Sequence, residues 1–281
     1  LVGSEMCIRD SYKPDHMFLH DVAVKEPLGS CVFPYQKIFK TLKQTGIEFD
    51  YLKLQRVYSD DLQRLINIDS NHFTRISRDK SRLIDCSLGF DHYFGQLSKN
   101  RRKGLKKRYR QLEQQGAVNL LVSDKARRQE YMERFLLLEK AGWKGDKGNA
   151  ILNTQGQTDF FRKVADYDET LILLLESGGV LVAGRVCVVS NNSLFICKTS
   201  FNESYRQYAP GELLLLETVK HACAEKIDTV NLMSDLPYHQ HLSNASQPLH
   251  SYELYKKNTR CIILIFTRKI IFALKSLIQS D

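Results

Sequence analysis

Three apolar runs joined by two tight turns constrain the fold of this chain more than any other feature. Residues 170–176, 180–190 and 193–200 have the length and the aliphatic character of buried strands. Residues 177–179 read Ser-Gly-Gly and residues 191–192 read Asn-Asn, and both turns suit hairpins because Gly and Asn tolerate a positive φ angle. The pattern predicts an antiparallel meander of three strands.

Amphipathic segments on either side of the meander predict a mixed fold. Apolar residues recur at three- and four-residue steps over residues 127–141, 158–165 and 212–226, as in helices with one buried face. Next we expect a strand at residues 229–233 and an irregular segment at 234–246. Two strands at 250–257 and 260–266 and a final helix at 267–279 should follow. The chain is therefore predicted to be an α/β (α+β) protein with a mixed, mostly antiparallel sheet flanked by helices.

The first half of the chain is less regular. Helices are expected at residues 35–45 and 60–67 and a strand at residues 49–57. Residues 70–90 are polar and mixed, which predicts a loop with one or two short strands. Residues 90–115 predict one long helix.

That long helix is strongly basic, with eight Lys or Arg side chains and no acidic one between Lys99 and Arg110. The whole chain has 41 Lys and Arg against 32 Asp and Glu, so its net charge of +9 attracts nucleic acid, acidic lipid or a phosphorylated ligand. Tyr109, the one aromatic residue of this stretch, falls on the inward face, and no nucleic-acid-binding motif is recognised. The sequence therefore argues against nucleic acid as the partner.

Two halves are expected, 12–125 as an incomplete N-terminal half with the basic helix over 90–115, and 126–281 as a C-terminal half with the meander. Residues 1–11 (LVGSEMCIRDS) contain no secretory signal and resemble a sequence artefact, so we exclude them from the fold.

Seven cysteines occur singly, without a CxxC pair, which predicts reduced thiols in a cytoplasmic protein and no zinc site. His239 and His241 lie two residues apart without an evident third ligand, so no metal is expected. No apolar run reaches the roughly 18 residues of a membrane span. An apolar stripe over residues 270–278 leaves peripheral membrane contact open, although packing on the sheet is the commoner fate of such a stripe.

The junction between the third meander strand and the next helix is the most informative place for function. Its loop reads Tyr-Arg-Gln-Tyr-Ala-Pro-Gly at residues 205–211. Pro210 suits the first turn of a helix, because it has no N–H to leave unpaired, and Gly211 lets the backbone approach a ligand. The free N–H groups and dipole of the helix, with Arg206 nearby, predict an anion site for a diphosphate; the alternative is an ordinary loop-to-helix turn.

Four stretches resemble a known family in their order: LEKAGWKGDKGNAI, DFFRKVA, VLVAGRV and LFICKTSFNESYRQYAPGELLLLETVKHA. With the basic segment LSKNRRKGLKKRYRQLEQQG before them, they are similar to the GNAT-type N-acyltransferase superfamily, in its CelD-like and FemAB-like (BioF-like acetyltransferase) branch. The resemblance implies the GNAT acyl-CoA N-acyltransferase fold, often as two GNAT-like halves. It also implies acetyl-CoA or another acyl-CoA as co-substrate.

The resemblance assigns the acyl-CoA diphosphate to the loop residues Tyr205, Arg206, Gln207, Tyr208, Ala209, Pro210 and Gly211. The strand at 193–200 would part from the strand at 229–233 to admit the pantetheine arm. Lys198 and Thr199, at the end of the first of these strands, would touch the cofactor or simply close the sheet. The expected chemistry is direct attack of an amine or hydroxyl on the thioester.

Asp235, Tyr238 and His239 are the candidate catalytic residues, because they follow the strand that should end beside the thioester. A carboxylate or imidazole there could take the acceptor proton, and a tyrosine could protonate the leaving thiolate; the alternative is a solvated polar loop. Relatives usually carry a segment of the sort DFGxGxxxYKxxW here, whereas this chain reads NLMSDLPYHQHLS, with His239 in place of Lys. The acceptor is therefore left open.

Trp143 and Lys144 are the candidate acceptor-binding residues, as the wall of the cleft and as a partner for an anionic acceptor. The alternative is a core Trp with a solvated Lys. Glu139, just before them, is a possible base but is better explained as a surface residue of a helix. A small molecule or a glycan precursor of the cell envelope or of a polysaccharide is the expected acceptor.

Two other functions compete with acyl-CoA transfer. The basic helix could make the chain a non-enzymatic module that binds nucleic acid or a membrane. A transferase that uses aminoacyl-tRNA, like the FemAB enzymes of peptidoglycan, would also account for the basic charge.

Overall fold

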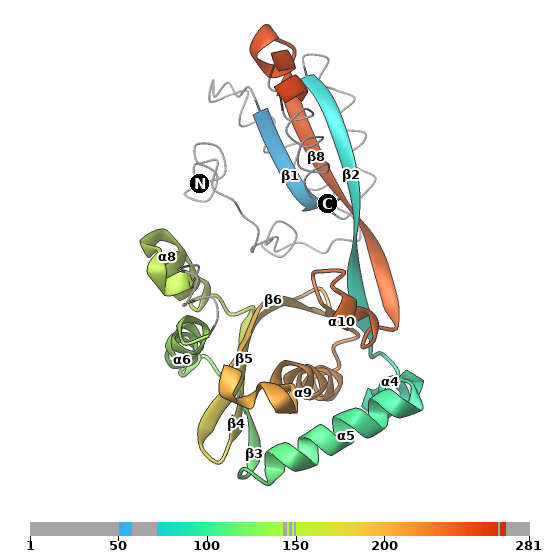
Figure 1. Cartoon of the computed structure of the whole chain (residues 1–281), viewed down its shortest axis with the longest axis vertical. Helices are drawn as coiled ribbons and strands as arrows, with labels where there is room; N and C mark the ends of the chain where they lie inside the picture. Colours follow the sequence, from blue (N-terminus) through green and yellow to red (C-terminus); the bar gives the residue numbers. More distant parts are fainter. Residues whose placement is uncertain are drawn as a thin grey trace, which may run out of the picture. The chain divides into compact units, whose positions relative to one another are not determined.

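The computed structural model of the chain describes residues 51–57, 72–142, 145, 148, 150–263 and 265–267. These residues fall into two compact units. The larger unit runs from Lys80 to Gln247, and the smaller contains the described residues before Lys80 and from Pro248 onward. Figure 1 shows the elements of both units.

Six strands form the sheet of the larger unit, in the order β2-β7-β6-β5-β4-β3. Their bounds are β2 His72–Asp85 (of which the part from Lys80 belongs here), β3 Val118–Val122, β4 Thr170–Ser177, β5 Val180–Ser190, β6 Ser193–Phe201 and β7 Thr229–Asn231. All neighbours are antiparallel except β6 and β7, which are parallel because helix α9 (Pro210–Ala224) connects them as a crossover. The predicted mixed, mostly antiparallel sheet is confirmed.

The meander of β4, β5 and β6 forms with the two expected hairpins. Gly178 and Gly179 have φ angles of 58° and 79°, and Asn191 and Asn192 have φ angles of 47° and 56°. Both turns therefore use the left-handed backbone region that their residues tolerate. At the first turn, a Cβ atom on Gly116 would lie 2.4 Å from Gly178 Cα, so Gly116 cannot carry a side chain.

Helices cover both faces of this sheet (Figure 1). One face carries α4 (Phe90–Gln96), α5 (Lys99–Glu113) and α9, and the other carries α6 (Arg128–Lys140), the 3-10 turn η1 (Ile151–Asn153) and α8 (Gln155–Val164). Side chains along β4 alternate between the two cores, as the pleat of a strand requires. Leu173 and Leu175 pack with the first group, and Ile172 and Leu174 with the second.

The smaller unit contains β1 (Tyr51–Val57) paired antiparallel with β8 (Ala245–Lys256), and the strand order there is β1-β8-β2. After β8 the chain turns helical, at residues 259–263 and 265–267. The strand predicted over 260–266 is therefore wrong. Asn258 explains the difference, because its Oδ1 accepts a hydrogen bond from the backbone N–H of Cys261 at 2.8 Å and so caps the start of a helix.

Four further elements differ from the prediction. Residues 70–90 contain the 14-residue strand β2, where only short strands were expected. The helix predicted over 90–115 is two helices, because Leu97 is extended and Ser98 Oγ caps α5 by accepting from the Arg101 N–H at 3.3 Å. Strand β3 was not expected, and α10 (Pro237–Gln240) lies in the segment predicted to be irregular.

Some predictions fall outside the described residues. These are the artefact at residues 1–11, the helices at 35–45 and 60–67, and the final helix beyond Thr267. The proposed division into two GNAT-like halves stays a prediction.

Candidate functional site

The sheet of the larger unit opens between β6 and β7. These strands pair over three residues only, with Leu194 opposite Val230 at the centre. β7 ends at Asn231, whereas β6 continues to Phe201 with β5 on its other side. The second half of β6 therefore has an edge that no described strand covers, and an extended ligand can form hydrogen bonds there.

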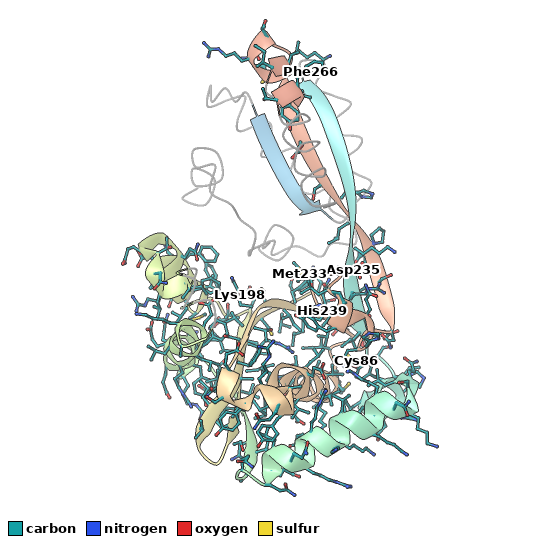
Figure 2. The ribbon with its side chains drawn as sticks, viewed as in Figure 1. Cys86, Lys198, Met233, Asp235, His239 and Phe266 are labelled. Atoms are coloured by element: carbon teal, nitrogen blue, oxygen red, sulfur yellow. The ribbon has the colours of Figure 1, made fainter. Side chains whose placement is uncertain are left out.

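A bulge lies in this uncovered half of β6. The ladder with β5 passes from Ile196 to Lys198 and leaves Cys197 without an opposite residue. Bulges bend a strand and redirect its side chains, and they are common beside active sites. Lys198 and Thr199 follow the bulge directly, so the two residues predicted to touch the cofactor or to close the sheet lie in the uncovered half of β6. Lys198 is labelled in Figure 2.

The N-terminus of α9 lies just beyond the end of β6. The 3-10 turn η2 (Glu203–Tyr208) leads to Ala209, which adopts the left-handed conformation at φ 50° and ψ 56°, and Pro210 then begins the helix. No side chain caps α9. A Cβ atom on Gly211 would meet nothing closer than Phe201 Cδ1 at 4.0 Å, so the backbone is open to a ligand. An uncapped helix start of this kind suits an anion.

The remaining side chains of the loop line its approach. Tyr205 and Tyr208 are partly buried against the core, with ring centroids 6.1 Å apart. Arg206 and Gln207 are exposed, and Arg206 makes only a 3.7 Å ion pair with Glu203. Arg206 is therefore available to a diphosphate at the helix start.

A buried arginine underlies this loop. Arg185, on β5, is 4% exposed and donates hydrogen bonds to Thr199 Oγ1 at 3.0 Å, Thr218 Oγ1 at 3.0 Å and the Gly211 carbonyl at 3.4 Å. It forms no ion pair with any described carboxylate. Burial lowers the pKa of Arg185 to about 10, so the side chain stays charged at neutral pH. The sheet thus holds a fixed positive charge beneath the first turn of α9.

The end of β7 is shaped by a buried asparagine. Asn231 Oδ1 accepts hydrogen bonds from Ser81 Oγ at 2.6 Å and from the Met233 N–H at 2.9 Å, and Met233 has a positive φ of 53°. This turn sets the direction of the segment that leads into α10. Ser234 Oγ then lies 2.6 Å from His239 Nδ1, so a hydroxyl and an imidazole are paired next to the opening.

The electrostatic surroundings of the three predicted catalytic residues differ. Burial, with a smaller effect from Arg185, lowers the pKa of His239 to about 4, so its imidazole is neutral at pH 7. Hydrogen bonding from Arg82, at 2.5 Å, holds the pKa of Asp235 below its usual value. Tyr238 is 51% exposed and its ring meets the His239 ring edge-on at 4.2 Å between centroids. His239 and Tyr238 are thus together, whereas Asp235 is bound to Arg82; Figure 2 shows Asp235 and His239 on this segment.

Several predicted residues have other positions or roles. Thr199 is bound by Arg185, which favours closure of the sheet over direct cofactor contact. Glu139 is 1% exposed, and its Oε2 accepts from the Ile151 N–H at 2.8 Å, so the expected surface position is wrong. Trp143 and Lys144 lie outside the described residues.

Sequence reasoning missed Arg185 and Ser234. The signal for Arg185 was a single arginine inside the apolar run VLVAGRVCVV, because such a residue is almost never buried without a specific role. No signal marked Ser234, since its pairing with His239 depends on the turn at Met233.

The described part of the chain shows neither a metal site nor a membrane span. It contains no group of three His, Cys, Asp or Glu side chains placed to hold a metal ion. None of its helices is both long and apolar enough to cross a membrane.

Comparison with known proteins agrees with this geometry. The family model described as an acetyltransferase (GNAT) domain matches residues 99–240. Comparison with curated protein sequences finds no match.

Three solved structures share the fold. The C-terminal domain (DUF2156) of a proposed lysylphosphatidylglycerol synthetase from Agrobacterium fabrum has a TM-score of 0.57 at 9% identity, over 83% of this chain and 76% of that one. A conserved protein of unknown function from Bacteroides thetaiotaomicron has a TM-score of 0.55 at 12% identity, over 79% and 74% of the two chains. FemX has a TM-score of 0.54 at 10% identity, over 82% and 78%.

Identities this low show the fold alone, whereas the family match covers just over half of the chain. The matched stretch contains the opening between β6 and β7, the uncapped start of α9 and the Ser234–His239 pair. The chain therefore belongs to the GNAT family of acetyltransferase domains, and membership in this family implies the use of acyl-CoA.

Proposed function

We propose that this chain is an acyl-CoA-dependent acyltransferase that moves an acetyl or other acyl group to an amine or hydroxyl. The observation that carries the proposal is the opening between β6 and β7 directly beside the uncapped start of α9. A thioester with a diphosphate at its far end needs these two features together: an uncovered strand edge and an anion site.

The residues present suit acyl-CoA. The first turn of α9 offers backbone N–H groups and the positive end of a helix dipole to the diphosphate, and Arg206 adds an exposed cation. Arg185 holds the Gly211 carbonyl from below, so the loop is fixed before the ligand arrives. The amides of the pantetheine arm find their partners on the edge of β6 near Lys198.

The reaction proposed for this site is direct transfer. The acceptor nitrogen or oxygen attacks the thioester carbon, a new C–N or C–O bond forms, and the C–S bond breaks to release CoA thiolate. The proton that the acceptor loses ends on the thiolate. Ser234 and His239 form the group best placed to move that proton, because the imidazole is neutral and hydrogen-bonded to the hydroxyl. Tyr238 is a second donor for the thiolate, and Asp235 fixes the segment through Arg82.

The acceptor we propose is an amine or hydroxyl of a cell-envelope or polysaccharide precursor, as in the CelD-like and FemAB-like branch. Supporting this are the sequence motifs and the shared fold with FemX and with the lysylphosphatidylglycerol synthetase domain. Trp143 and Lys144 remain the proposed residues for acceptor binding.

A CoA-release assay tests the proposal. The full chain is given acetyl-CoA with a panel of amines, amino sugars and sugar hydroxyls, and thiol release is followed. We expect acceptor-dependent release, and we expect CoA to raise the melting temperature in proportion to the logarithm of its concentration. Absence of both effects, with stabilisation by aminoacyl-tRNA or anionic vesicles instead, would overturn the proposal in favour of the competing functions.

A further inference from the structure

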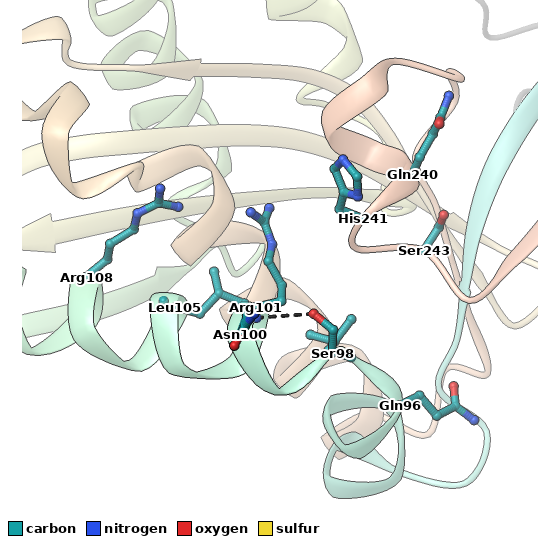
Figure 3. Close-up of a pocket in the computed structure, with 11 residues that line it drawn as sticks. Gln96, Ser98, Asn100, Arg101, Leu105, Arg108, Gln240, His241 and Ser243 are labelled. Atoms are coloured by element: carbon teal, nitrogen blue, oxygen red, sulfur yellow. Dashed lines mark hydrogen bonds between the residues drawn. The ribbon is translucent and has the colours of Figure 1, made fainter.

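A second pocket lies on the larger unit, between the first half of α5 and the end of α10. This α5–α10 pocket has a volume of about 640 Å³ (Figure 3). Its polar lining comes mainly from Ser98, Asn100, Arg101 and Arg108 of the α5 segment and from His241 and Ser243 after α10. No carboxylate is among the described residues that line it. A pocket lined by donors and cations without an acid suits an anionic ligand.

Unpaired polar atoms are concentrated in this lining. Arg101 Nε and Ser243 Oγ are buried and have no hydrogen-bond partner. Arg101 Nη2 is also without one; it lies 2.9 Å from Glu212 Oε1, close enough for an ion pair but without hydrogen-bond geometry. Buried polar atoms are nearly always paired, so donors left unpaired on two sides of one pocket point to a ligand between them.

The two arginines of the pocket are held in place in advance. Glu212, in the first turn of α9, makes ion pairs with Arg101 at 2.9 Å and with Arg108 at 2.7 Å. One carboxylate therefore fixes two guanidinium groups and leaves one positive charge uncompensated. Fixed arginines of this kind bind phosphate oxygens with little loss of side-chain freedom.

We infer that the α5–α10 pocket binds a phosphate monoester. Two ligands of the proposed reaction can carry this group. One is CoA, through its 3′-phosphate, and the other is a phosphorylated acceptor. Only the choice between these sources rests on the proposed function. Glu212 lies in the first turn of α9, so the two arginines of the pocket are ion-paired with the helix that forms the proposed diphosphate site.

Two variants of the full chain test the inference. In each of them, the fold should keep its stability while phosphate binding weakens. In Ser243→Ala the free protein loses an unpaired buried hydroxyl, so its melting temperature should stay the same or rise, while phosphate binding weakens. In Gly104→Met a side chain enters the pocket from α5, where a Cβ atom would meet nothing within 4 Å, so the fold is kept and the pocket is filled. Gly95→Met is the matched control, because Gly95 is also helical with open space around it but does not line the pocket.

Calorimetric titrations with CoA, 3′-dephospho-CoA and glucosamine 6-phosphate distinguish the sources. If CoA supplies the phosphate, wild type should prefer CoA over dephospho-CoA by about tenfold or more, and both pocket variants should lose that preference while Gly95→Met keeps it. If the acceptor supplies it, glucosamine 6-phosphate should bind wild type and not the pocket variants.

Other results have distinct meanings. Equal binding of CoA and dephospho-CoA, together with no binding of the sugar phosphate, overturns the inference and leaves the acyltransferase proposal standing. Sugar-phosphate binding in the pocket without any binding of CoA contradicts the acyltransferase proposal and supports the pocket.

Discussion

Arg185→Met should weaken acyl-CoA binding far more than it weakens the fold. Arg185 donates three hydrogen bonds and carries a buried charge beneath the first turn of α9. Methionine has a similar length and no charge, so it fills the space while removing both the donors and the positive potential.

The expected change in stability is small because two large terms oppose one another. The two bonds at 3.0 Å are the strong ones, and hydrogen bonds from a charged group contribute about 1.5–3 kcal/mol each, or roughly 3–6 kcal/mol together. Against this, a buried guanidinium costs several kcal/mol of desolvation, which the variant recovers. The free energy of unfolding should therefore change by less than about 2 kcal/mol.

The expected change in CoA affinity is larger. At a separation of about 10 Å, a single charge would contribute roughly 3 kcal/mol to the binding of a diphosphate with two charges, at an effective dielectric constant of about 20 and before screening by salt. Loss of the contact with the Gly211 carbonyl also loosens the loop. We expect CoA to bind at least about tenfold more weakly.

Titration calorimetry with CoA and with pantetheine measures this effect against its own control. Pantetheine has no diphosphate, so its affinity should be the same in wild type and in Arg185→Met. The CoA affinity of Arg185→Lys, which keeps the charge, should lie between the affinities of wild type and Arg185→Met. Unchanged CoA affinity in Arg185→Met, or equal losses for CoA and pantetheine, would refute the electrostatic reasoning.

Three further predictions concern the same site. The pKa of His239 is lowered to about 4, below the value of about 6.5 in an unfolded chain, so the unfolded state binds the proton first as the pH falls. Stability that is fully present above about pH 6.5 should fall by about 3 kcal/mol towards pH 4. Urea titrations should show a shallower fall in His239→Gln, and an equal fall in both would contradict the assignment. Ala209→Gly should leave stability unchanged or raise it by up to about 1 kcal/mol, because a left-handed alanine is strained, whereas Ala209→Val should unfold at a lower temperature than wild type. Ser234→Ala should lower kcat about 100-fold with little change in KM for acetyl-CoA if the hydroxyl moves a proton, and an unaltered kcat would remove Ser234 from the mechanism.

The meander and α9 were predictable because local chemistry alone specifies them. The Ser-Gly-Gly and Asn-Asn turns set the hairpins, and Pro210 with Gly211 marks the helix start. The length of β2 was missed because its sequence, HFTRISRDKSRLID, is mostly polar and lacks a long apolar alternation. The break at Leu97 and Ser98 was also hidden, since the apolar stripe continues through it.

The candidate site was predictable only where it depends on a continuous segment. The loop at 205–211 could be found in the sequence, as could the group formed by Tyr238 and His239. The roles of Arg185 and Glu212 could not be predicted, because their partners are distant in the sequence. Arg185 bonds to residues 14 and 33 positions away, and the partners of Glu212 are at least 104 positions away. Asp235 was assigned as a base because the sequence does not reveal its pairing with Arg82, which lies 153 residues away on β2.

A crystal structure of the chain with CoA tests the central claim most directly. We expect the diphosphate on the first turn of α9, next to Ala209 and Gly211, with the pantetheine arm along the uncovered edge of β6. The thiol should point towards Ser234 and His239. A structure in which CoA is bound elsewhere, with β6 and β7 closed against one another beyond Asn231, would contradict the account.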